Sequence, residues 1–164
     1  MTELHRRIAA AQGYVELGLH AEAREELAAL PVEAHGRVDV VELTLLCLMG
    51  EKRWEEAFVL AASLCMKEPA EPGGFIHAAF CLHEMDRTAE ALDFLSRGPA
   101  ELRKKPEYFY NMGCYHAKLG QQDKALRYLK QAFEMDPGLR HHARRDPDLD
   151  GVRALLQRSA ATSA

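Results

Sequence analysis

Small and apolar residues recur along this chain at a constant interval inside amphipathic stretches. Four alanines are separated by 34 residues each time, with no insertion or deletion: Ala23, Ala57, Ala91 and Ala125. Twelve residues before each of them lies another small or apolar residue: Ala11, Leu45, Ala79 and Gly113. Apolar faces with helical spacing on both sides of a short break predict two helices joined by a turn. The pattern therefore predicts four helix pairs, and no strand.

Turn-forming residues fall where the pattern requires breaks. Gly or Asp, which can end one helix and begin the next, occurs in the four segments Leu17-Gly18-Leu19-His20, Met49-Gly50-Glu51-Lys52, Glu84-Met85-Asp86-Arg87 and Leu119-Gly120-Gln121-Gln122. Prolines lie near the joints between pairs, where a missing amide donor costs least: Pro31, Pro69, Pro72, Pro106 and Pro137.

These units resemble the tetratricopeptide repeat, whose unit is a 34-residue helix pair. The clearest match runs from Tyr108 to Pro137, and the positions that fit the family pattern are Phe109, Met112, Gly113, Gly120, Ala125, Leu129, Ala132 and Pro137. The resemblance implies an all-α fold: a right-handed α-solenoid of four helix-turn-helix repeats at about 4–37, 38–71, 72–105 and 106–139. Leu45 departs from the pattern, because a small residue is usual there, and Gly98-Pro99 should end a helix early.

The repeat is lost beyond Leu139, and a different element is expected there. Asp146 is a good N-cap and Pro147 suits the first helical position, so a capping helix is predicted at about 146–158. Val152, Leu155 and Leu156 would form its apolar face against the last repeat. We therefore expect a single domain over 1–158 and a disordered tail over 159–164.

Composition and charge narrow the class of partner. Apolar residues make up 48% and charged residues 28%, the balance of a globular protein, and the formal net charge is -4. This charge gives no general attraction to phosphate backbones or anionic lipid, so nucleic acid and membrane are not expected as partners. No apolar run has the length of a secretion signal or a membrane span, which predicts a cytoplasmic protein. We expect the thiols of Cys47, Cys65, Cys81 and Cys114 to be buried and unbridged.

Catalytic signatures are not found. The sequence has no phosphate-binding glycine loop, no HExxH and no GxSxG. One alternative is a metal-dependent enzyme, because His77, Cys81 and Glu84 follow the i, i+4, i+7 spacing of one helix face. The adjacent His141 and His142 point about 100° apart on a helix and are interpreted as solvated linker residues. We expect no enzyme activity, catalytic residue, metal or cofactor.

The resemblance implies where a partner polypeptide would bind. In tetratricopeptide proteins the first helices of successive units line the concave side of the solenoid, where peptides or helices of other proteins lie. The matching positions are mostly apolar with a few polar groups, as in a peptide-binding groove. They are Ile8, Gln12, Val15, Glu42, Leu43, Leu46, Met49, Ile76, His77, Phe80, His83, Tyr110, Asn111, Cys114 and Lys118.

Two further alternatives, a chaperone and a homo-oligomer, concern the partner that the groove would bind. The subclass that clamps acidic tails of heat-shock chaperones is not supported, because the matching places hold Ile8, Gln12, Leu43, Gly73 and His77. Small bacterial tetratricopeptide chaperones of secreted translocator proteins are similar in size and in the segment Phe75–Leu82. The other alternative is a structural subunit that forms homo-oligomers through these apolar residues.

Overall fold

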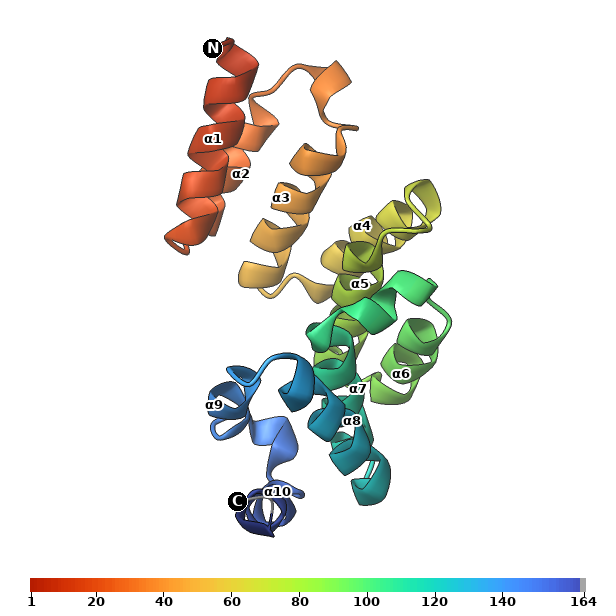
Figure 1. Cartoon of the computed structure of the whole chain (residues 1–164). Helices are drawn as coiled ribbons and strands as arrows, with labels where there is room; N and C mark the ends of the chain where they lie inside the picture. Colours follow the sequence, from red (N-terminus) through yellow and green to blue (C-terminus); the bar gives the residue numbers. More distant parts are fainter. Residues whose placement is uncertain (163–164) are drawn as a thin grey trace. The chain divides into compact units, whose positions relative to one another are not determined.

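The chain forms four helix pairs in the register that its sequence predicts (Figure 1). The computed structural model describes residues 1–162, and within them it contains helices, turns and irregular segments but no strand. The pairs are α1 (Glu3–Glu16) with α2 (His20–Ala28), α3 (Val38–Gly50) with α4 (Trp54–Lys67), α5 (Pro72–Glu84) with α6 (Thr88–Ser96), and α7 (Pro106–Lys118) with α8 (Gln122–Met135). The second helices start 34 residues apart. None of the described helices is both long and apolar enough to cross a lipid bilayer.

Contacts divide the chain into two compact units, Met1–Glu68 and a second that begins at Pro69. In the first unit α1 packs on α2 and α3, and a 3₁₀ turn, η1 (Val32–Ala34), follows α2. In the second unit α5 packs on α6 and α7 packs on α8. As expected, α6 ends before Gly98-Pro99, and the 3₁₀ turn η2 (Ala100–Lys104) follows and buries Leu102 completely.

The periodic alanines form the core of the pairs. Ala23, Ala57, Ala91 and Ala125 each have no exposed surface, which confirms that a small residue is packed between helices at this position. Gly113 fulfils the same need on the facing helix, since an added Cβ would lie 2.6 Å from the Cγ atom of Leu129. The buried residues thus explain the constant interval: one larger side chain would separate the two helices.

The turn inside each pair needs one residue in the left-handed conformation. It is Gly18 (φ 73°) in the first pair and Gly120 (φ 74°) in the fourth, but Lys52 (φ 58°) in the second and Asp86 (φ 59°) in the third. Gly50 therefore is not the turn residue that its position suggested. It is the last residue of α3, and an added Cβ there would collide with the ring of His20.

The predicted capping helix is interrupted. After a short helix α9 (Leu139–Ala143), Asp146 caps only a 3₁₀ turn, η3 (Pro147–Leu149), by accepting a bond from the Asp148 amide. The next helix, α10, spans Arg153–Thr162 and so starts later and ends later than expected. Gly151, a weak helix former, lies at the interruption. Residues 159–162 of the expected disordered tail are helical, and 163–164 lie outside the described residues.

Candidate partner-binding site

The C-terminal part of the chain folds back onto the predicted groove of the second unit. We call residues 139–152, which comprise α9, η3 and their connections, the return segment. Within this unit η3 packs against α7. Three predicted groove residues are buried beneath or beside the return segment: His83 is 7% exposed, Tyr110 6% and Cys114 4%. The return segment therefore covers most of these three side chains, and their role in binding a partner stays a prediction.

Two carboxylates of the return segment meet the groove residues. The Nε2 atom of His83 lies 2.7 Å from Oδ2 of Asp148, and the hydroxyl of Tyr110 donates to Oδ2 of Asp146 at 2.7 Å. The Sγ atom of Cys114 lies 3.7 Å from the same Asp146 oxygen. Donors of α5 and α7 thus face acceptors of the return segment, so these buried polar groups are hydrogen-bonded.

Hydrogen bonds at both ring nitrogens fix the orientation of His83. Its Nδ1 lies 2.9 Å from the hydroxyl of Thr88, and its ring lies 4.9 Å from that of Tyr115. Because a carboxylate only accepts, Nε2 must carry the proton that is shared with Asp148. This hydrogen bond lowers the pKa of Asp148, and the charge of Lys118 acts in the same direction.

The thiols of the two units are poor nucleophiles. All four are buried and unbridged, as predicted. Burial raises the pKa of Cys65 and Cys81 to about 11, and it also raises the pKa of Cys47. Burial and the nearby carboxylate of Asp146 raise the pKa of Cys114. Thiolates are therefore scarce at neutral pH, and the site offers no activated sulfur.

Apolar contacts also hold the return segment in place. Leu149 and Val152 are 0% and 1% exposed, and Ala143 is 5% exposed. The ring of His142 lies 5.5 Å from that of Tyr110. The guanidinium of Arg153 donates to the carbonyl of Asp146 at 2.8 Å and to that of Ala143 at 3.3 Å, which closes the loop between α9 and α10. The segment is therefore an integral part of the second unit.

An open cleft remains beside the return segment. Its volume is about 610 Å³, and its lining comes from α5, the turn after α5, α7 and the return segment. It brings together Phe80, His83 and Lys118 from the predicted groove, whereas Ile76, His77 and Asn111 are half-buried outside its lining. The complete lining is Phe80, His83, Glu84, Asp86, Lys118, His141, His142, Arg145, Asp146, Pro147 and Asp148.

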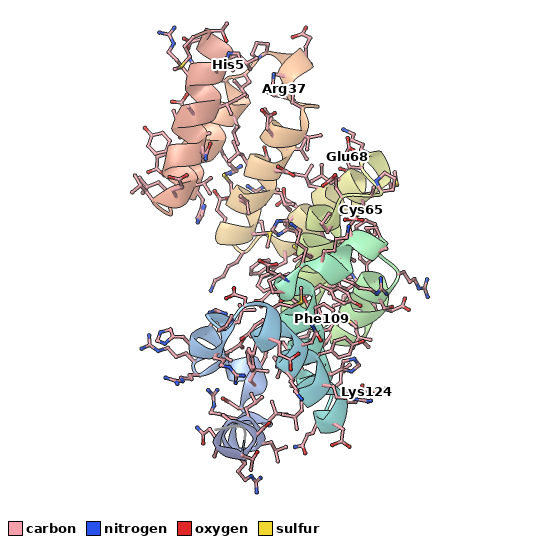
Figure 2. All side chains as sticks on the ribbon, viewed as in Figure 1. His5, Arg37, Cys65, Glu68, Phe109 and Lys124 are labelled. Carbon is pink, nitrogen blue, oxygen red and sulfur yellow. The ribbon has the colours of Figure 1, made fainter. Side chains whose placement is uncertain are left out.

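The predicted groove residues of the first unit are placed differently. Ile8, Val15 and Leu43 are partly buried and pack against a core that contains Ala11 and Val40. Leu46 and Met49 on α3 are half-buried, and the remaining two, Gln12 and Glu42, are exposed. Side chains of this unit, including the labelled His5 and Arg37, are drawn in Figure 2. Part of the apolar set therefore belongs to the core of this unit and part is accessible.

Sequence reasoning missed the residues that the return segment contributes. His141, His142 and Arg145 line the cleft, although the two histidines were interpreted as linker residues. Asp146 was expected only as a cap, but its carboxylate also binds Tyr110. The available signal was the set Ala143, Leu149 and Val152, since apolar residues that continue past the last repeat imply a further packed segment.

The hypothesis of a metal site on α5 receives no support from the geometry. Across the part of the chain that the structure describes, no group of three or more His, Cys, Asp or Glu side chains is placed to hold a metal ion. Cys81 is completely buried and Glu84 is exposed, so the two point to different environments. Burial lowers the pKa of the half-buried His77.

Comparisons with known proteins agree with this architecture. The family model "Tetratricopeptide repeat" matches residues 106–139, the unit built from α7 and α8. A comparison with curated proteins gives no match. Among solved structures, MamA from AMB-1 is similar with a TM-score of 0.63 and 21% identity, covering 82% of this chain and 76% of that one. MamA from MSR-1 is similar with a TM-score of 0.62 and 20% identity, covering 82% and 75%. The unit at residues 106–139 thus matches the tetratricopeptide repeat, and the other three helix pairs share its 34-residue interval and the fold of these solved structures.

Proposed function

We propose that this protein is a non-catalytic interaction module that binds a peptide or helix of another protein at the first-helix faces of its repeats. In the second unit the binding place is the cleft lined by Phe80, Lys118 and the return segment. The single observation that carries the proposal is that this cleft of about 610 Å³ remains accessible beside groove residues that the return segment otherwise covers. A cavity of this size accommodates several side chains of a guest segment.

The groups that line the cleft support binding of a peptide rather than catalysis of a reaction. Phe80 offers an apolar surface, while Lys118, Arg145, Glu84 and Asp86 also line the cleft, so charges of both signs are available to backbone and side-chain groups. Such a mixture of an apolar anchor with polar groups is typical of peptide recognition. The buried thiols have raised pKa values, and His83 is already bonded at both nitrogens. Neither a thiol nor His83 is therefore poised here as a nucleophile or a free general base.

In the first unit the accessible part of the predicted groove is Leu46, Met49, Gln12 and Glu42 on α1 and α3. We propose that these residues bind the partner as well. A chaperone for secreted translocator proteins would be one case of this function, with an apolar segment as guest. Self-association through the same residues is the competing proposal, in which the guest is a second copy of the chain.

Site-specific photo-cross-linking tests the proposal. A photoreactive amino acid replaces Lys118, which is exposed and lines the cleft, and in a matched variant it replaces Lys130, which is exposed on α8 outside the cleft. Irradiation in native extract should give a specific adduct with another protein only from position 118. An adduct with the chain itself would favour the homo-oligomer, and equal adducts from both positions would contradict binding at the cleft. Light scattering over a range of concentrations separates the first two outcomes.

A further inference from the structure

A second cleft lies on the opposite side of α7 from the return segment. Its volume is about 550 Å³, and its lining comes from α6, α7 and α8. Figure 2 labels Phe109 on α7 and Lys124 on α8, which both belong to it. On α7 the residues that bind the return segment are Tyr110 and Cys114, whereas Phe109, Met112 and His116 face the second cleft. With about 100° between successive residues, these two sets lie on different faces of one helix.

The floor of this cleft is apolar and aromatic. Phe109 and Tyr128 have ring centroids 6.3 Å apart, and the ring of His116 is stacked on that of Tyr128 at 5.2 Å. The Nδ1 atom of His116 lies 2.6 Å from Oε1 of Gln121, which fixes the imidazole in the stack. Leu92 and Met112 complete the apolar surface. An aromatic surface of this kind favours an aromatic or aliphatic side chain of the bound segment.

The rim of the cleft is cationic. Lys124 and Arg127 are exposed, three positions apart on α8, and so lie on the same side of the helix. None of the described residues that line the cleft is an Asp or Glu. Within residues 1–162 neither Lys124 nor Arg127 forms an ion pair, whereas Arg53 pairs with Glu56 and Arg87 with Glu90. Two cations beside an apolar floor are thus left without a carboxylate.

We propose that this cleft is a second binding site, which takes an acidic peptide segment of a partner protein that carries an aromatic or aliphatic side chain beside its carboxylates. The apolar side chain packs on Phe109 and Tyr128, and the carboxylates pair with Lys124 and Arg127. We infer an acidic ligand from charge complementarity, because the cationic rim attracts acidic segments and repels basic ones. The site is distinct from the cleft beside the return segment, so one repeat domain holds two guests on the two sides of α7.

Fluorescence anisotropy with the full chain tests this site. The probe is a short fluorescein-labelled peptide with a central Trp-Leu pair flanked by Glu, and two comparison peptides carry Gln or Lys in place of Glu. We expect saturable binding of the Glu peptide that weakens with added salt, weaker binding of the Gln peptide and none of the Lys peptide. The double variant Lys124→Glu with Arg127→Glu should weaken binding of the Glu peptide by roughly tenfold or more.

Two control variants test whether the effect of the double variant is specific to this cleft. Lys130→Glu changes one charge on the same helix outside the cleft and should weaken binding clearly less than the double variant does, because Lys130 lies three positions from Arg127 but does not line the cleft. Phe80→Glu, in the other cleft, should leave the affinity for this probe unchanged. The proposal is overturned if the Glu peptide does not saturate, if the Gln peptide binds equally well, or if Lys130→Glu has the same effect as the double variant. Circular dichroism of each variant verifies that it is folded.

Discussion

The imidazole of His83 and the carboxylate of Asp148 are 2.7 Å apart, although 65 positions separate them in the sequence. This pair joins α5 to the return segment and covers the predicted groove of the second unit. Because the hydrogen bond lowers the pKa of Asp148, the folded state binds a proton there less readily than the unfolded state. The pair therefore stabilises the fold at pH values above the unfolded pKa of the carboxyl, and this contribution disappears as the pH falls through the folded pKa.

Asp148→Asn should lower the free energy of unfolding at neutral pH by about 1–2 kcal/mol, because the charged acceptor of the His83 proton is replaced by a neutral one. Urea denaturation followed by circular dichroism measures the difference. The loss should be constant near neutrality and should vanish in acid, where the wild-type carboxyl is protonated as well. Glu134→Gln, at an exposed position of α8, is the control. It should leave the free energy of unfolding unchanged both at neutral pH and in acid. A loss that persists unchanged in acid would contradict the assigned ionic contribution.

Gly113→Ala should destabilise the fourth pair by about 1–3 kcal/mol, because the new methyl group would overlap with Leu129. Gly13→Ala is the matched control, since Gly13 lies inside α1 with no neighbouring atom within 4 Å of an added Cβ. There the same substitution should stabilise the helix by roughly 0.5–1 kcal/mol. Chemical denaturation of both variants measures whether each substitution lowers or raises the free energy of unfolding. Equal effects at the two positions would show that close packing is not the reason for Gly113.

The four turns allow a test of backbone strain. Gly18→Ala and Gly120→Ala should each cost about 1–2 kcal/mol, because the left-handed conformation places Cβ too close to the following carbonyl oxygen. Lys52→Gly should instead stabilise its turn by up to about 1 kcal/mol, since glycine removes that strain but loses more chain entropy on folding. Thermal unfolding of the three variants gives the comparison. A destabilised Lys52→Gly would mean that the lysine side chain contributes more than its backbone strain costs.

Thiol chemistry should report burial directly. With all four cysteines buried and their pKa values raised, modification by a disulfide reagent at mildly alkaline pH should be far slower in the native protein than in urea. All four thiols should react promptly after unfolding. A single fast-reacting thiol in the native state would identify a segment that opens, and peptide mapping would locate it.

Substitutions at the proposed binding faces should separate recognition from folding. Phe80→Glu in the second unit and Leu46→Glu in the first should each abolish capture of the partner, because a carboxylate replaces an apolar contact. Both residues are half-buried, so helical circular dichroism must be unchanged for the result to count. Lys130→Glu is the control with an added carboxylate outside these faces. Intact capture by both variants would remove the first-helix faces from the proposed function.

The helix pairs could be predicted because a local steric need recurs in the sequence. Ala23, Ala57, Ala91 and Ala125 are completely buried between paired helices, where a larger side chain would push the helices apart. Gly18, Gly120 and Asp86 carried a sequence signal for the left-handed turn position, because Gly and Asp tolerate this conformation. Lys52 adopts it without such a signal, and Gly50, two positions before Lys52, was misleading.

The candidate site was predicted less well, because it depends on contacts between distant positions. Helical periodicity identifies which residues share a face, and the resemblance to tetratricopeptide repeats named Phe80 and Lys118, which line the cleft, as groove residues. It cannot say what covers that face. The burial of Tyr110 by Asp146 depends on the path of the chain after α8, and the sequence signal was limited to a few apolar residues beyond the last repeat.

The return segment has a consequence for the way the second unit unfolds. In a simple array of repeats each unit contacts only its neighbours, so the last one can open alone. Here Asp148 is bonded to α5 of the third pair, while Leu149 and Val152 are buried in the same unit. Opening α5 must break this bond to the return segment. Amide hydrogen exchange should therefore proceed at matched rates in α5, α7 and residues 139–152, as one cooperative block.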